Sequence, residues 1–169
     1  ISKRKVRFIS LNIWYIYMSF TLDKESDNYA TDKKGWEIIK DYIPKDKVLW
    51  SPFYCDGKQK EYFKEMGLDT IHEDKDFFSY TPEYDILIDN PPFSKWKEIC
   101  QKLKELDKPF IIIAFPKVIL TKRFTNLFQD HLQIIIPKAR PTFTHLTKPK
   151  KGYTPPYGTW YMCYKMNLE

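Results

Sequence analysis

Hydrophobic positions along the chain follow two alternating patterns, one typical of buried strands and one typical of amphipathic helices. Short apolar runs predict strands at residues 47–50, 69–73, 84–89, 110–115 and 132–136. Apolar residues spaced three or four apart predict helices at residues 33–43, 58–66, 96–106 and 118–129. This alternation predicts an α/β fold in which helices cover both faces of a mostly parallel sheet.

The end of the chain and one short connection refine this expectation. Residues 159–166 form another apolar run after a basic, proline-rich loop with no helical pattern, so we expect an antiparallel last strand. Only twelve residues separate His72 from Asp85, which leaves no room for a further helix–strand–helix unit. We therefore expect a reduced sheet, with ligands bound beyond the carboxyl ends of its strands.

The first residues differ from the rest of the chain. Residues 6–22 are apolar after a basic start, which superficially resembles a signal peptide or a membrane anchor. Polar residues interrupt this run and no small-residue cleavage site follows it, so we expect no membrane association. Its alternation favours a strand or a docking arm. A natural start at Met18, with residues 1–17 as upstream read-through, is the alternative.

Charge is distributed unevenly along the chain. The formal net charge is +6, but residues 116–169 carry nine Lys/Arg and two acidic residues, which gives this third +7. The remainder, with 19 basic and 20 acidic residues, is close to neutral. A one-sided basic region fits a polyanion such as nucleic acid, and a solvated lysine-rich surface explains the charge equally well.

Cysteine and histidine usage favours neither a metal site nor a disulfide framework. Cys55, Cys100 and Cys163 are odd in number and far apart. The three histidines do not cluster, so we expect each of them to be a surface or core residue. We predict no metal and a cytoplasmic protein, located in the host cytoplasm if the chain is viral.

The most specific signal is Asn90-Pro91-Pro92-Phe93, directly after an apolar strand. The two prolines make a rigid turn, so that the Asn90 side-chain oxygen and the Pro91 carbonyl can accept hydrogen bonds from one amino group. Phe93 offers a flat face on which a planar ring can stack. Acceptors of this kind suit an exocyclic amine that gains positive charge during methyl transfer. A proline-stiffened turn beside a core phenylalanine is the simpler alternative.

These four residues resemble the signature of the N6-adenine DNA methyltransferase family, (Asp/Asn/Ser)-Pro-Pro-(Tyr/Phe). Residues 50–57 (WSPFYCDG) are similar to the first motif of small phage and large-DNA-virus members. The resemblance covers about residues 29–169, the expected catalytic domain, and leaves residues 1–28 as an N-terminal extension. It implies a Rossmann-like class I methyltransferase fold, S-adenosyl-L-methionine as cofactor and the N6 amino group of adenine in DNA as acceptor.

The resemblance also implies roles for individual residues. The loop after the first strand would wrap the cofactor, an acid ending the second strand would hold its ribose, and an acid–aromatic pair would hold its adenine. Glu73 is the expected ribose ligand, with Asp74 as the alternative. The expected catalytic residues are Asn90, Pro91, Pro92 and Phe93. The expected cofactor-binding residues are Tyr29, Thr31, Ser51, Pro52, Phe53, Gly57, Glu73, Asp76 and Phe77.

Substrate selectivity has to come from loops or from a partner, because the spacing of the motifs leaves no room for an inserted recognition domain. Residues 138–158 are the first candidate. Two other readings stay open: a methyltransferase acting on an amino group of RNA or on a protein glutamine amide, and a non-catalytic nucleic-acid-binding relic. The residues expected to bind nucleic acid are Lys138, Arg140, Lys148, Lys150 and Lys151.

Overall fold

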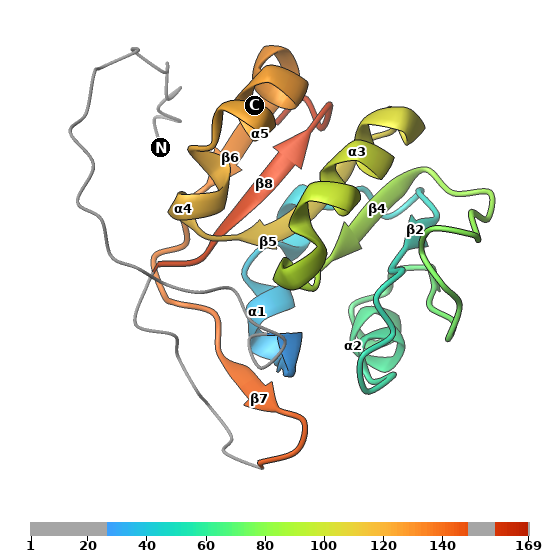
Figure 1. Cartoon of the computed structure of the whole chain (residues 1–169). Coiled ribbons are helices and arrows are strands. Elements are labelled where there is room, and N and C mark those ends of the chain that lie inside the picture. Colours follow the sequence, from blue (N-terminus) through green and yellow to red (C-terminus); the bar gives the residue numbers. More distant parts are fainter. Residues whose placement is uncertain (1–26, 149–157, 169) are drawn as a thin grey trace, which may run out of the picture.

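The computed structural model describes residues 27–148 and 158–168, which form a six-stranded sheet flanked by helices (Figure 1). The strand order across the sheet is β3-β2-β4-β5-β8-β6. Neighbours pair in parallel from β3 to β5, whereas β8 is antiparallel to both β5 and β6. The strands are β2 (Leu49–Trp50), β3 (Thr70–Ile71), β4 (Ile86–Asp89), β5 (Phe110–Ala114), β6 (Leu132–Ile135) and β8 (Trp160–Tyr164).

This topology confirms the predicted fold class, an α/β fold in which helices cover both faces of a reduced, mostly parallel sheet. The last apolar run is the reversed strand β8, as predicted from the absence of a helical sequence pattern before it. Within the described residues, the segment between β3 and β4 contains no further strand, so the sheet is reduced as expected. The carboxyl ends of β2 and β4 lie side by side because these strands are parallel neighbours.

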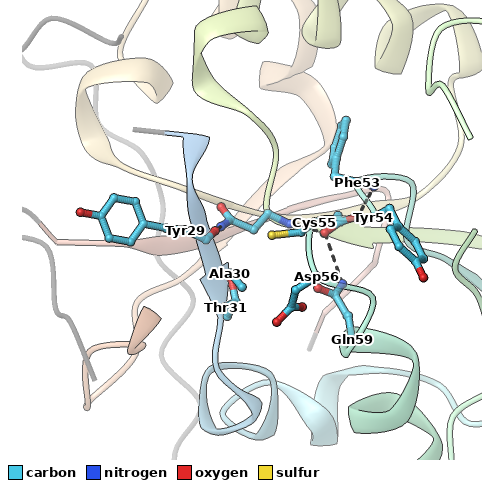
Figure 2. A pocket seen from close by; sticks show the side chains of 10 residues that line it. Tyr29, Ala30, Thr31, Phe53, Tyr54, Cys55, Asp56 and Gln59 are labelled. Carbon is cyan, nitrogen blue, oxygen red and sulfur yellow. Dashed lines mark hydrogen bonds between the residues drawn. The ribbon is translucent and has the colours of Figure 1, made fainter. Parts of the chain in front are cut away.

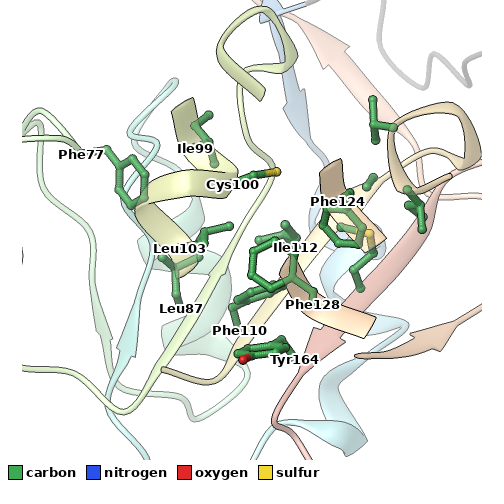
Figure 3. Close-up of a cluster of buried hydrophobic side chains, with 14 of the residues drawn as sticks. Phe77, Leu87, Ile99, Cys100, Leu103, Phe110, Ile112, Phe124, Phe128 and Tyr164 are labelled. Carbon is green, nitrogen blue, oxygen red and sulfur yellow. The ribbon is translucent and has the colours of Figure 1, made fainter. Parts of the chain in front are cut away.

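Both faces of the sheet are buried, since alternate residues of each central strand enter two different cores. In β5, Phe110 and Ile112 pack into one core and Ile111 and Ile113 into the other. Figure 3 shows the first core, in which side chains of α3 and α5 meet the sheet. Helices α1 and α2 contribute Trp36 and Phe63 to the second. Burial on both faces explains why these strands read as continuous apolar runs.

The helices agree with the expected ones except where two predicted helices are divided. Residues 33–43 form a short α-helix and then a 3₁₀ turn, and residues 118–129 fall in two helices. The second division has a local cause, because Thr121 caps a new helix by accepting a hydrogen bond from the Phe124 N–H at 3.3 Å. The helices are α1 (Lys33–Glu37), α2 (Gln59–Glu65), α3 (Trp96–Leu106), α4 (Pro116–Ile119) and α5 (Lys122–Phe128), with 3₁₀ turns η2 (Lys40–Tyr42), η3 (Phe93–Lys95) and η4 (Gln129–His131).

One element differs from the expectation, a two-stranded ribbon outside the main sheet. β1 (Tyr29–Thr31) pairs antiparallel with β7 (Phe143–His145), both in segments expected to be loops. The Asp32 N–H donates to the Thr142 carbonyl at 3.0 Å, and the Thr144 hydroxyl donates to the Asp32 carboxylate at 2.7 Å. The basic segment predicted to be an irregular loop is therefore partly fixed to the start of the domain.

Several expectations fall outside the described residues: the apolar run 6–22, the alternative start at Met18, and the basic residues Lys150 and Lys151. Of the helices described, none combines the length and apolar character needed to cross a membrane.

Candidate active site

A narrow pocket lies at the carboxyl ends of β2 and β4. Figure 2 shows β1 on one side of it and the loop between β2 and α2 on the other. The pocket measures about 20 Å³, which is room for one or two water molecules. Its lining residues are Tyr29, Ala30, Thr31, Phe53, Tyr54, Cys55, Asp56, Gln59, Asp89 and Asn90.

The carboxylate of Asp89 is the centre of this region. It is 1% exposed, and all four groups around it are donors. Its Oδ2 accepts from the Phe53 N–H at 2.7 Å and the Ser51 hydroxyl at 3.0 Å. Its Oδ1 accepts from the Asn90 N–H at 2.7 Å and the Gln59 amide at 3.3 Å. Burial raises the pKa of Asp89 to about 7, although these four hydrogen bonds each act to lower it.

Asn90 presents a buried acceptor beside this carboxylate. Its side-chain NH₂ donates to the Tyr29 carbonyl at 3.3 Å. A carbonyl can only accept, so this contact fixes the orientation of the amide and directs Oδ1 the other way. Within the described residues, Oδ1 is buried and has no hydrogen-bond partner. Since a buried polar group is usually paired, an acceptor left open at a pocket wall is suited to a ligand donor.

The rest of the motif forms a rigid turn into α3. Pro91 is buried, and the Lys95 N–H closes the turn by donating to the Pro92 carbonyl at 3.1 Å. The ring of Phe93 is half-buried and lies 4.6 Å from the Phe115 ring, measured between centroids. It therefore has packed support while part of its surface stays accessible. Asn90 lines the pocket whereas Phe93 does not, and the stacking role of Phe93 stays a prediction.

The loop from Ser51 to Gly57 faces this turn across the pocket. Ser51 and Pro52 are buried, Phe53 is half-buried and Tyr54 to Asp56 are exposed. Gly57 has φ +75°, and a Cβ there would lie 2.8 Å from the Tyr54 hydroxyl oxygen, so the close turn needs glycine. The Ser51 carbonyl lies 2.8 Å from Nδ1 of His72, a buried imidazole whose pKa burial lowers. His72 thus anchors the loop from the end of β3.

The remaining expected cofactor residues occupy two different places. Tyr29 and Thr31 line the pocket from β1, whereas Glu73, Asp76 and Phe77 lie outside it.

Asp76 is exposed and accepts a hydrogen bond from the Ser79 N–H at 3.1 Å. Phe77 is 4% exposed and packs on the rings of Trp50 and Phe53, which leaves little of its face accessible. Glu73 accepts from the Tyr80 hydroxyl at 2.8 Å. Their roles stay predictions.

The predicted nucleic-acid-binding residues that are described lie around the β1–β7 ribbon. Lys138, Arg140 and Lys148 are exposed, and Lys148 donates its N–H to Nδ1 of His145 at 3.0 Å. β7 is paired with β1, and the Tyr29 carbonyl of β1 holds the Asn90 amide. Strand β1 thus contacts both the Asn90 side chain and β7, the strand within the basic segment.

Two residues important to the pocket were not among the predicted site residues. Asp89 ends an apolar strand and precedes the motif, a position in which a buried charge is a signal in itself. Gln59 gives no such signal, since it is one polar residue in the first turn of α2. Its contacts with Ser51 at 2.8 Å and with Asp89 depend on the folding of α2 against β4.

The donors and acceptors of this region fit a nucleoside-containing cofactor such as S-adenosylmethionine in part. The close turn at Gly57 lets the loop backbone approach a ligand, and Thr31 Oγ1 is a second buried polar atom with no hydrogen-bond partner in the described part of the chain. Across residues 27–148 and 158–168, no group of three His, Cys, Asp or Glu is placed to hold a metal ion. Cys55, Cys100 and Cys163 are free thiols.

Comparisons with known proteins give only a limited likeness to solved structures. No protein-family model and no curated protein sequence matches the chain. A solved structure that it resembles is the precorrin-6y C5,15-methyltransferase from Geobacter metallireducens GS-15, which is 13% identical. The match covers 86% of this chain and 100% of that chain, with a TM-score of 0.46. At this level the likeness carries no argument about activity.

Proposed function

We propose that the protein transfers a methyl group from S-adenosylmethionine to the N6 amino group of adenine in DNA. The observation that carries the proposal is the buried Oδ1 atom of Asn90, an acceptor with its direction fixed and no hydrogen-bond partner among the described residues. It lies in a rigid turn at the carboxyl end of a central parallel strand, where α/β sheets bind their ligands.

Asn90 and Phe93 supply what an exocyclic amine needs. The lone pair of such an amine is delocalised into its ring, so the nitrogen is a poor nucleophile. Asn90 Oδ1 accepts a hydrogen bond from the amine, and this bond strengthens as the nitrogen becomes positive. Phe93 supports the ring by stacking, which orients the nitrogen. An amide oxygen does not take a proton, so the excess proton leaves to solvent after methyl transfer.

The loop from Ser51 to Gly57 and strand β1 are the proposed binding elements for the cofactor. S-adenosylmethionine, when bound, supplies an electrophilic methyl group. The loop and β1 face the pocket from opposite sides and both contact the Asp89–Asn90 segment. Residues that hold the cofactor therefore also border the acceptor of the amine. We retain Glu73 and Asp76 as proposed ligands of the ribose and adenine.

DNA is the proposed substrate because of the basic segment attached to β1. A duplex hides the adenine amino group in its stack, so the base has to swing out, which costs a few kcal/mol. Contacts from Lys138, Arg140 and Lys148 to phosphates would offset that cost. These side chains are exposed and lie before and after β7, whose partner strand β1 contacts Asn90.

The proposal is tested by incubating the full chain with methyl-labelled S-adenosylmethionine and, separately, with DNA, RNA and a release-factor protein. The expected result is label in DNA, recovered as N6-methyladenine after digestion to nucleosides. Label in RNA or in a protein glutamine would replace the substrate class while keeping amino methylation. Calorimetry with S-adenosylhomocysteine runs in parallel, and absence of both binding and transfer would support the relic reading.

A further inference from the structure

We infer that Asp89 is a positioning residue that holds the cofactor loop and the catalytic turn in one register. The inference rests on the proposed function. Asp89 ends β4 and is buried between the loop after β2 and the turn that begins at Asn90. Among the described hydrogen bonds, no other side chain accepts from both segments. One carboxylate oxygen holds the loop after β2, and the other holds the turn that begins at Asn90.

The first half of this role concerns the loop. The Phe53 N–H points at Oδ2 of Asp89 from 2.7 Å, and the Ser51 hydroxyl lies 3.0 Å from the same atom. Beyond Phe53 the loop is exposed and reaches the positive-φ residues Cys55 (51°) and Gly57 (75°). The carboxylate therefore fixes the part of the loop that is still buried, just before the exposed residues that follow Phe53. Loss of that acceptor would leave a backbone N–H unpaired and release the loop.

The second half concerns Asn90. Its backbone N–H donates to Oδ1 of Asp89 at 2.7 Å, while its side chain donates to the Tyr29 carbonyl at 3.3 Å. The backbone and the side chain of Asn90 are thus each held by a separate hydrogen bond. Together these bonds fix the direction of the open Oδ1 atom. Gln59 of α2 completes the arrangement by donating to Asp89 and to Ser51 Oγ. In all four of these described hydrogen bonds, a carboxylate oxygen of Asp89 is the acceptor.

The two roles of Asp89, holding the loop and holding the Asn90 turn, can be separated by moving the carboxylate to residue 51. The Ser51 and Asp89 side chains touch, and the Gln59 amide contacts both. A carboxylate at residue 51 can accept from the N–H two residues later, as in an Asx turn, and from Gln59. It would hold the loop but leave the Asn90 N–H without its acceptor. The double variant Ser51→Asp/Asp89→Ala therefore restores one duty only.

The test compares Asp89→Ala, the double variant Ser51→Asp/Asp89→Ala, and Asp41→Asn as a control that removes one exposed acid in η2. Asp89→Ala should weaken S-adenosylhomocysteine binding about tenfold to a hundredfold, the scale expected for hydrogen bonds to a charged group, and should lower the transfer rate further. The double variant should regain cofactor affinity but not the transfer rate. Asp41→Asn should match the wild type in both.

Hydrogen exchange at the Phe53 and Asn90 amides separates this inference from the proposed function. Asp89→Ala should speed exchange at both amides by about tenfold or more, and the double variant should protect Phe53 alone. If Asp89→Ala leaves both amides as protected as in the wild type, or leaves affinity and rate unchanged, the positioning role is wrong. If exchange responds as expected but the wild type neither binds the cofactor nor transfers methyl, the carboxylate still locks the two segments and the methyltransferase proposal fails.

Discussion

Two buried regions of the molecule are built on opposite principles. The core under α5 is aromatic, with Phe110, Phe124 and Phe128 at most 1% exposed. The Tyr164 hydroxyl beside these rings donates to Asp107 at 2.9 Å. The region around Asp89 buries a carboxylate and an unpaired amide oxygen. Burial of apolar rings stabilises the fold, whereas burial of polar groups costs free energy unless each is paired. The first region therefore stabilises the domain, whereas the open oxygen in the second costs free energy unless a donor pairs with it.

The largest expected effect on stability belongs to the aromatic core. Phe128 has ring centroids 4.9 Å from Phe124 and 5.3 Å from both Phe110 and Tyr164. Phe128→Ala should lower the free energy of unfolding by about 3–5 kcal/mol through the cavity it leaves. Phe78→Ala, which removes a ring that is 37% exposed, is the matched control and should cost far less. Equal losses of unfolding free energy in denaturant titrations of the two variants would contradict the larger contribution of the aromatic core.

The polar region should show itself in the pH dependence of stability. Burial raises the pKa of Asp89 from its ordinary 3.8 to about 7. Because the folded-state pKa lies above the unfolded one, its contribution is fully present below pH 4 and is lost as the pH rises through 7. The wild type should therefore lose a few kcal/mol relative to Asp89→Asn between pH 4 and pH 8. A constant difference between their unfolding free energies over this range would contradict the raised pKa.

A variant at Asp76 tests how far the cofactor site extends beyond the pocket. This residue lies outside the pocket, while the expectation from sequence places it on the cofactor adenine. Asp76→Ala should weaken S-adenosylhomocysteine binding by about 1–3 kcal/mol through loss of a hydrogen bond. Asp69→Ala, at an exposed position before β3, is the control. Unchanged affinity in Asp76→Ala would confine the cofactor to the residues that line the pocket.

The smallest effect concerns the basic segment. DNA affinity should weaken with salt by about 0.9 log unit per log unit of salt for each phosphate contact. Lys138→Gln/Arg140→Gln should flatten that slope by up to about two contacts, and joint neutralisation of Lys148, Lys150 and Lys151 should flatten it further. Lys60→Gln/Lys64→Gln on α2 serves as the control for lost charge. If all three variants keep the wild-type slope, this segment does not hold the substrate.

The main sheet could be predicted from sequence because its strands are buried on both faces. β4 and β5 therefore read as uninterrupted apolar runs, and the reversed β8 follows from the absence of a helical pattern before it. The ribbon could not be predicted, since β1 and β7 have three residues each and pair over more than a hundred positions. Strands so short carry no periodicity of their own.

The candidate site was predictable where chemistry is written in consecutive residues. Asn90 to Phe93 form one turn, so their spacing alone indicates an acceptor and a platform. The contacts of Asp89 with Phe53 and Gln59 join residues 36 and 30 positions apart, and no local pattern encodes them. Likewise, the support of the Asn90 amide by Tyr29 spans 61 positions. Sequence indicates which groups are present, and the fold decides which of them meet.

The central claim is that the open oxygen of Asn90 receives the amino group of the substrate. Its most direct test is the rate of methyl transfer by Asn90→Ala, measured in a single turnover at saturating cofactor and DNA. The rate should fall roughly 100- to 1000-fold, as for loss of one transition-state hydrogen bond, while S-adenosylhomocysteine affinity and thermal midpoint stay near those of the wild type. Asn126→Ala, at an exposed position of α5, should keep full activity. A transfer rate for Asn90→Ala close to that of the wild type would contradict the account.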